Sequence, residues 1–275
     1  MKNILIPTNF TDSSRNATDY ALGLYKNQIS RVILLNVYEQ PHFGRGIQKS
    51  LVHILEQNSL KGLEEDKLRI LEMYPDLQEK IEIVPMQGEL LTSVNFMLTN
   101  ESIDIIVMGS KGDREIVDLF IESETAKVVR SVEAPILVVP PKASFGKLSR
   151  ITLTSDLKKI TNVQVIQEMI DLAQNNEAEV DVLHVQVQPN EKSADIEKLL
   201  DGYLKEIRHD FHYIKSKDIP TGIYKFIKEK NSDLVTAVKR KGRGNLISRL
   251  FHQSMSRQIV RHVHQPLLLM HDLNY

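Results

Sequence analysis

Short apolar runs alternate with longer amphipathic segments along the chain, and each run is bounded by turn residues. Such runs are typical of parallel strands covered on both faces. In the first half they predict strands at residues 2–7, 31–37, 81–85, 105–108 and 136–139. The alternation of strands and helices predicts an α/β fold, in which a parallel sheet with right-handed crossovers has helices on both faces.

The segments between these runs have the features of helices. Ala17, Tyr20, Ala21 and Leu24 form an apolar face with i, i+3, i+4, i+7 spacing, preceded by Thr11, Asp12 and Ser13 as candidate N-caps. Residues 42–74 predict a loop followed by a long charged helix that Pro75 ends. Its mixed-sign residues from 56 onward indicate a solvent-exposed helix with i, i+4 ion pairs. A shorter helix is predicted at 89–98.

The pattern then repeats. A polar bridge at 142–147 is the predicted linker between a first domain at 1–141 and a second at 148–275. Five landmarks recur in the same order, among them RITLTS at 150–155 for the first strand and HQPLLL at 264–269 for the last. The second copy is shorter, mostly opposite 42–74. The sequence therefore predicts an internal duplication.

The amino-acid composition limits the classes of function that this protein can have. Of the 275 residues, 41% are hydrophobic and 26% charged, which is ordinary for a globular protein, and the net charge of −1 gives no pull toward nucleic acid or membrane. There is no cysteine, which excludes disulfides and thiol chemistry. The opening MKNILIPTNF is too short an apolar run for a signal peptide or membrane span. We expect a cytoplasmic protein that contacts neither membrane nor nucleic acid.

The segment from Asp104 to Pro140 is the candidate for chemistry. It reads as a buried strand, a turn with Gly109 and Gly112, a helix, and a second buried strand. Two glycines three apart let the backbone pass close to a bulky group, and the N–H groups at the start of a helix can bind an anion. The turn has two interpretations, a phosphate-binding turn or a simple connection.

Three stretches together resemble the universal stress protein family: ILIPTNFTDSSRNATDYA from Ile4, LLNVYE from Leu34, and the segment from Asp104 to Pro140. The duplication resembles the tandem, two-domain members. The resemblance implies two domains, each a five-stranded parallel sheet between helices. It also implies that the domains pair within the chain as a pseudo-dimer, through Ile136–Val139 and Leu267–Met270. A homodimer of the whole chain is a further expectation.

ATP-binding members of this family carry G-x-x-G followed, after nine residues, by G-[ST]. Gly109, Gly112 and Ser123 match, but Glu122 stands at the third glycine, and Asn9 replaces the usual aspartate that accepts hydrogen bonds from adenine. The resemblance implies a pocket lined by ten residues: Pro7, Thr8, Asn9, Val37, Met108, Gly109, Lys111, Gly112, Ser123 and Glu124. Its ligand would be ATP with magnesium, and the protein would otherwise have no cofactor.

The departures have an electrostatic cost. Glu122 brings bulk and negative charge toward a triphosphate, with Asp113 and Glu124 nearby. At roughly 5–6 Å and an effective dielectric near 20, each repulsion costs about 3 kcal/mol before screening. Lys111 or magnesium would offset part of it. The second domain has no glycine opposite Gly109, so a nucleotide site is not expected there.

Two hypotheses follow for function. The first is a non-catalytic stress-response or regulatory protein with a degenerate nucleotide cleft. The second is an ATP-binding stress protein with one occupied site in the first domain and at most slow ATP hydrolysis. No arrangement of residues typical of nucleophilic or paired-carboxylate catalysis stands out.

Two further groups have plain interpretations. Residues 239–261 hold seven Lys or Arg and no acid, which indicates a solvated basic face able to meet an acidic partner rather than a nucleic-acid site. His262, His264 and His271 are interpreted as surface histidines that titrate near neutrality, with a metal site as the alternative.

Overall fold

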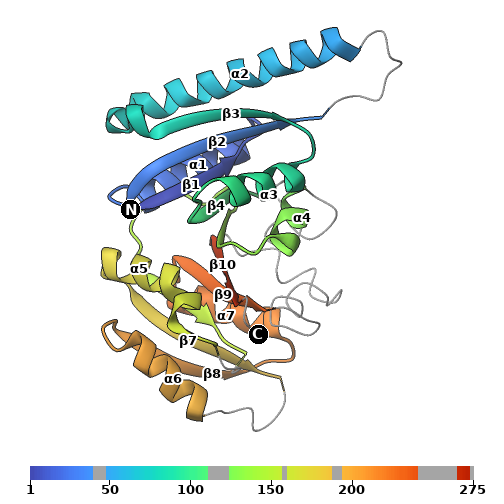
Figure 1. Ribbon diagram of the computed structural model, residues 1–275. Helices are drawn as coiled ribbons and strands as arrows, with labels where there is room; N and C mark the ends of the chain where they lie inside the picture. The colour runs from blue at the N-terminus through green and yellow to red at the C-terminus, as the bar shows by residue number, and fades with distance from the viewer. Residues whose placement is uncertain (40–47, 111–123, 157–159, 188–193, 241–264, 273–275) are drawn as a thin grey trace. The chain divides into compact units, whose positions relative to one another are not determined.

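The computed structural model describes residues 1–39, 48–110, 124–156, 160–187, 194–240 and 265–272, drawn as ribbon in Figure 1. Their contacts divide the chain into two compact units, with the division between Ser144 and Phe145. Each unit is an α/β domain built around a parallel sheet. The predicted fold class is therefore confirmed for both halves of the chain.

The first domain alternates strands and helices from its start. Its elements are β1 (Lys2–Pro7), α1 (Asp12–Leu24), β2 (Ile29–Tyr38), α2 (Gln48–Met73), a 3-10 turn (Pro75–Lys80), β3 (Ile81–Gln87), α3 (Leu90–Asn100), β4 (Ile105–Gly109), α4 (Glu124–Ser131) and β5 (Ile136–Val139). The five strands described here lie in the order β3-β2-β1-β4-β5, and every adjacent pair is parallel. The order reverses direction between β1 and β4, where ligands bind in open α/β sheets.

The second domain repeats this plan. Its elements are β6 (Arg150–Thr154), a 3-10 turn (Val163–Ile166), α5 (Gln167–Asn176), β7 (Glu179–Gln186), α6 (Ala194–Leu204), β8 (His209–Lys215), α7 (Ile219–Lys230), β9 (Leu234–Arg240) and β10 (Leu267–Asp272). In the described part of this domain the strand order is β8-β7-β6-β9-β10, again all parallel. It matches the order of the first domain strand for strand.

Equivalent hydrogen bonds show that the two domains are copies. The carboxylate of Asp104 accepts from the backbone N–H of Asn3 at 2.7 Å, and that of Asp233 accepts from the N–H of Arg150 at 2.9 Å. In each case an aspartate just before the fourth strand holds the first strand in register. The duplication expected from sequence landmarks is thus present in the contacts.

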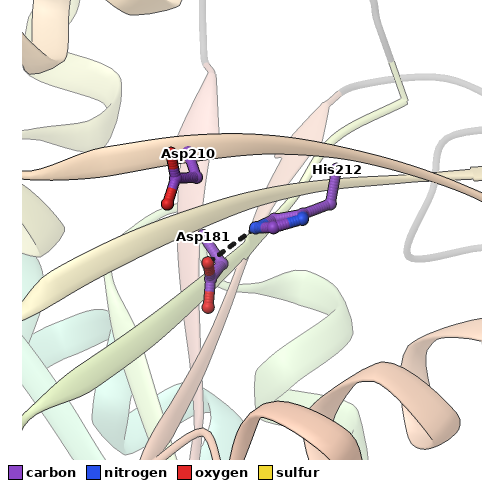
Figure 2. A group of neighbouring side chains, drawn as sticks. All are labelled: Asp181, Asp210 and His212. Carbon is purple, nitrogen blue, oxygen red and sulfur yellow. Dashed lines mark hydrogen bonds and ion pairs between the residues drawn. The ribbon is translucent and has the colours of Figure 1, made fainter.

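Helices cover both faces of each sheet. In the first domain α1 and α2 are joined by ion pairs, whereas α3 and α4 pack against each other in front of the sheet in Figure 1. In the second, neighbouring residues of β8 point to opposite faces. His212 packs on Phe226 of α7 and hydrogen-bonds Asp181 of β7 (Figure 2), whereas the Tyr213 hydroxyl donates to Glu197 of α6.

The cores consist of the short apolar runs. Ile105 to Val107 and Ile136 to Val139 are fully buried, and Leu267 to Met270 are at most 4% exposed. Branched and aliphatic side chains on both faces of a strand are expected where helices cover both faces. No helix among the described residues is long and apolar enough to cross a membrane. The pairing of the two domains through their last strands stays a prediction.

The long helix α2 differs from its prediction. Its mixed-sign sequence indicates a solvent-exposed helix, but Leu63 and Ile70 are fully buried, and Asp66 is only 4% exposed. An i, i+4 pair does join Lys61 and Glu65 on the outer side, at 3.9 Å. One face of α2 is therefore packed against the sheet, and a charged residue lies on that face.

Candidate functional site

A pocket of about 170 Å³ opens at the carboxyl edge of the first domain's sheet. Seven of the ten residues expected there line it: Pro7, Thr8, Asn9, Val37, Met108, Gly109 and Glu124. Lys111, Gly112 and Ser123 lie outside the described residues. The described walls of the pocket enclose less than the roughly 300–1,000 Å³ of typical ligand sites.

Sequence reasoning missed seven other lining residues: Thr11, Ser13, Ser14, Glu39, Gly88, Leu90 and Thr125. Gly88, directly after β3, has a φ of 141°, a conformation that favours glycine. The position of Gly88 directly after a predicted strand was the feature of the sequence that could have indicated that it lines the pocket. The hydroxyl residues carried no such signal, because their convergence depends on how α1 packs against β4.

The loop between β1 and α1 forms one wall of the pocket. Thr11 is the N-cap of α1 and accepts a hydrogen bond from the backbone N–H of Ser14 at 3.4 Å. Its own hydroxyl donates to Oδ1 of Asn9 at 2.7 Å. The amide oxygen of Asn9, which the resemblance assigns to adenine, therefore already accepts a hydrogen bond within the loop.

Phe10 holds this loop against α2. Its backbone lies in the left-handed region with a φ of 64°, which is unusual for an aromatic residue. A Cβ built on Gly62 of α2 would lie 2.6 Å from the Phe10 ring, so the ring packs directly on the backbone of the helix. Glycine at position 62 makes room for this contact.

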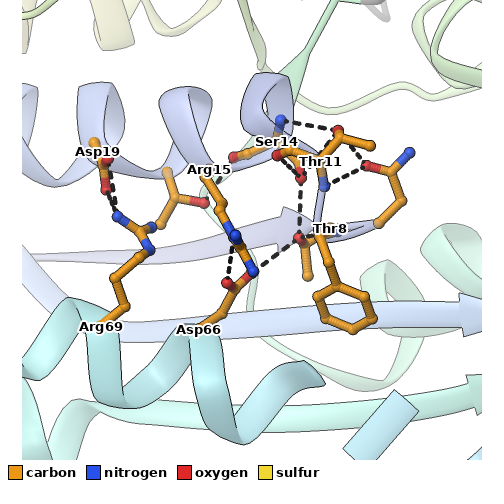
Figure 3. Close-up of polar contacts among 10 residues, drawn as sticks. Thr8, Thr11, Ser14, Arg15, Asp19, Asp66 and Arg69 are labelled. Atoms are coloured by element: carbon orange, nitrogen blue, oxygen red, sulfur yellow. Dashed lines mark hydrogen bonds and ion pairs between the residues drawn. The ribbon is translucent and has the colours of Figure 1, made fainter. Parts of the chain in front are cut away.

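A buried polar network lies beneath the loop (Figure 3). Arg15 of α1 donates to the carboxylate of Asp66 at 2.8 Å, and the Thr8 hydroxyl lies 3.4 Å from the same carboxylate and 3.2 Å from the Ser14 hydroxyl. The network joins α1, α2 and the end of β1. Because Thr8 lines the pocket, the carboxylate on α2 fixes part of the pocket wall.

Asn36 adds a second connection to α2. Its amide donates to the carbonyl oxygen of Thr8 at 2.7 Å, and its Oδ1 accepts from the hydroxyl of Ser59 at 2.7 Å. Both side chains are buried. The backbone at Thr8 is thereby fixed from β2 as well as from α2.

Gly109 has a packing role. A Cβ at this position would lie 2.5 Å from the carbonyl oxygen of Ser13, and the Ser13 hydroxyl donates to the carbonyl of Ser110. The end of β4 therefore approaches the first turn of α1 too closely for any side chain at 109. This close approach accounts for the glycine without a ligand.

The charged groups that line the described part of the pocket are both carboxylates, Glu39 and Glu124. Lys127, one turn further along α4, pairs with Glu124 at 2.6 Å. The hydrogen bond that Lys127 donates to Glu124, with the charges of Glu124, Glu89 and Glu39, raises the pKa of the Lys127 ammonium group. The described lining therefore contributes two carboxylates, one of which is paired with Lys127.

The same edge of the second domain is arranged differently. The backbone N–H of Ser155 donates to Leu183, as that of Thr8 does to Leu35, so Asp156 corresponds to Asn9. Nη1 of Arg240 donates to both carboxylate oxygens of Asp156, at 2.7 and 2.8 Å, and both side chains are buried. The guanidinium group of Arg240 therefore occupies the carboxylate of Asp156, which is the acceptor that would otherwise face a ligand at this edge.

Two expectations on this domain need correction. Arg240 is 6% exposed and ion-paired, so it is not part of a solvated basic face. His271 is not a surface histidine that titrates near neutrality, because burial, together with the charge of Lys239, lowers its pKa to about 3. His262, His264 and residues 241–261 lie outside the described residues.

Comparison with known proteins agrees with this architecture. Residues 1–140 match the model of the universal stress protein family. Two universal stress proteins of Methanocaldococcus jannaschii are similar in sequence. One is 25% identical over 157 residues, covering 52% of this chain and 97% of that protein, and the other is 26% identical over 139 residues, covering 50% and 81%.

A solved structure extends the likeness to the whole chain. The crystal structure of a universal stress protein from Archaeoglobus fulgidus covers 98% of both chains, with a TM-score of 0.70 at 17% identity. At that identity the likeness concerns the fold. The family match, which spans half of the sequence, decides the classification. The chain belongs to the universal stress protein family.

Proposed function

We propose that this protein is a non-catalytic, regulatory member of its family, with a ligand pocket in the first domain that does not hold ATP tightly. The observation that carries the proposal is the charge of the pocket. Its described lining contributes Glu39 and Glu124 and no lysine or arginine. A triphosphate would meet carboxylates of like charge, whereas a neutral group of nucleoside size would not.

Two other features support the same function. The amide oxygen of Asn9 already accepts a hydrogen bond from Thr11, and Gly109 is required by the contact with Ser13 rather than by a phosphate. In the second domain the Asp156–Arg240 ion pair fills the equivalent position. We therefore assign ligand binding to the first domain.

The second candidate is ATP binding in the first domain, with magnesium and at most slow hydrolysis. It is favoured by the position of the pocket, at the switch point between β1 and β4, where ligands bind in this class of sheet. The hydroxyl groups of Thr11 and Ser13, which also line the pocket, are suitable donors to a phosphate or ribose.

Calorimetric titration with ATP and magnesium, and separately with adenosine, distinguishes the two candidates. We expect no saturable ATP binding by the native protein and a gain of binding in Glu124→Gln, because this change removes a negative charge from the pocket lining. Glu122→Gly, which restores the third glycine of the family motif, should also gain binding. Glu206→Gln, at an exposed residue of the second domain, is the matched control and should behave like the native protein.

Tight ATP binding by the native protein would refute the proposal and favour the second candidate. Adenosine binding without ATP binding would support it and identify the ligand class. Absence of all binding in every variant would show that the pocket does not accept adenine compounds and would restrict the proposal to its regulatory part.

A further inference from the structure

Three potential ligand groups converge on the sheet of the second domain. Asp181 lies on β7, and Asp210 and His212 lie on β8. One ligand atom from each lies within 4.8 Å of the others. Figure 2 shows the imidazole of His212 directed at the carboxylate of Asp181, with Asp210 on the same strand as His212. All three belong to one face, because Asp181 and Asp210 are paired in register and His212 is two residues further on.

The pairing of Asp181 with Asp210 is unfavourable in the protein alone. Like charges directly opposite each other on neighbouring strands destabilise a sheet. Asp181 is 1% exposed, so water screens its charge poorly. Asp210 makes no ion pair or hydrogen bond with another side chain in the described part of the chain. A bound cation would turn this repulsion into attraction.

Arg150 binds only one of the two carboxylate oxygens of Asp181. It donates to Oδ2 at 2.9 Å and also binds Glu179 at 2.6 Å, which Arg208 contacts in turn. These five charged residues, Asp181, Asp210, Glu179, Arg150 and Arg208, carry a net charge of −1. Ligand carboxylates in metal sites are commonly held by such outer hydrogen bonds, which orient the free oxygen. Here the oriented oxygen is Oδ1.

The imidazole of His212 is oriented as a ligand. Its ring packs against Phe226 of α7, with centroids 4.9 Å apart, and its Nε2 lies 2.7 Å from Oδ1 of Asp181. Zinc binds imidazole nitrogen and carboxylate oxygen at about 2.0–2.2 Å, so a small separation of these two atoms would admit the ion. Asp210 is exposed and can rotate to supply the third ligand.

We propose that Asp181, Asp210 and His212 form a binding site for a divalent transition-metal ion, of which zinc is the best fit. One imidazole and two carboxylates favour zinc over calcium or magnesium, which prefer all-oxygen ligands. The remaining coordination positions are left to water. Because β8 ends the strand order of this domain, the ion joins an edge strand to its neighbour and stabilises the domain.

The test is zinc titration of tag-free, chelator-treated full-length protein, followed by calorimetry. We expect one saturable site in the native protein. His212→Gln and Asp210→Asn should each weaken it at least about tenfold, since loss of an outer-shell partner alone costs 10–100-fold. His209→Gln is the matched control, because His209 is on the same strand but pairs with Asp201. It should keep native affinity. Cobalt absorption in the visible range gives an independent reading of the same site.

Asp210→Asn separates a metal site from a plain ion-pair network. Without metal this variant should unfold at the same temperature as the native protein or a higher one, because it removes a repulsive charge. With zinc it should gain less thermal stability than the native protein does. The proposal is overturned if native protein shows no saturable zinc binding. It is also overturned if His212→Gln and Asp210→Asn both bind zinc like the His209→Gln control, since the cluster would then be only the Arg150–Asp181–His212 network.

Discussion

Arg240 binds both carboxylate oxygens of Asp156 at the carboxyl edge of the second domain's sheet, with neither side chain more than 9% exposed. The first domain has an amide, Asn9, at the position of Asp156, and a pocket opens beside it. One duplicated edge thus holds an internal ion pair, whereas the other holds a pocket. The two domains have therefore diverged in the groups that lie beside the end of their first strand.

Removal of Arg240 should destabilise the second domain strongly. In Arg240→Met the carboxylate of Asp156 loses its buried cation, and breaking one partner of a buried ion pair costs about 3–5 kcal/mol. Urea unfolding followed by circular dichroism measures the loss. Arg31→Met is the control, because its ion pairs with Glu82 and Glu101 are partly exposed and should contribute at most about 1 kcal/mol. Equal losses in the two variants would contradict the prediction.

Gly109→Ala should destabilise the first domain by about 1–3 kcal/mol, the usual cost of overpacking. The added Cβ would lie 2.5 Å from the backbone oxygen of Ser13, which can move only if α1 moves. Gly146→Ala is the matched control, since a Cβ there has no atom within 4 Å. The free energies of unfolding of both variants should be compared in denaturant. A neutral Gly109→Ala would show that α1 is not fixed against β4.

Asp66→Asn should cost roughly 1.5–3 kcal/mol, because Asp66 is buried and the change takes the charge out of its hydrogen bond with Arg15 and weakens the contact to Thr8. Asp19→Asn breaks a similar arginine pair between the same two helices, but Asp19 is 40% exposed and its loss should cost at most about 1 kcal/mol. Thermal unfolding of the two variants in one buffer checks the difference. If Asp19→Asn proves the more damaging, the buried network does not anchor α2.

His271 should make the protein less stable in acid. Its pKa is lowered from 6.5 to about 3, so below pH 6.5 the unfolded chain binds a proton that the folded chain refuses. The stability contributed by this residue is complete above pH 6.5. It is lost as the pH falls toward 3, at up to about 1.4 kcal/mol per unit.

Unfolding free energies at pH 7, 6 and 5 test this dependence. His271→Leu should have a shallower slope than the native protein between these values. His53→Leu, at a residue whose side chain is 70% exposed on α2, should keep the native slope. If both variants have the native slope, His271 is not responsible for the loss of stability in acid.

Much of the fold follows from the sequence because the signal is local. The buried strands Ile105 to Met108 and Ile136 to Val139 are apolar on both faces, and only a sheet covered on both sides can bury such runs. The recurrence of Asp104 as Asp233 revealed the duplication, since the same backbone contact is required twice. Thr11 was among the caps expected for α1, and it is the cap.

The candidate site was predictable only in part. Residues directly after strand ends, such as Thr8 and Asn9, could be placed at the pocket by their position in the resemblance. Asp66 could not, because it lies in a charged helix whose sequence looks solvent-exposed, and only the packing of α2 turns that side chain inward. Likewise nothing in the spacing of His212 and Asp181 indicates that neighbouring strands bring them together.

The sequence by itself determined the family, the order of elements and the duplication, because periodicity and turn residues act over short distances along the chain. Tertiary structure alone decided which charges meet. It placed Arg240 on Asp156, Asp66 beneath the pocket, and Asp210 opposite Asp181. Electrostatic interactions depend on distance in space and on burial, and neither can be read from positions far apart in a sequence.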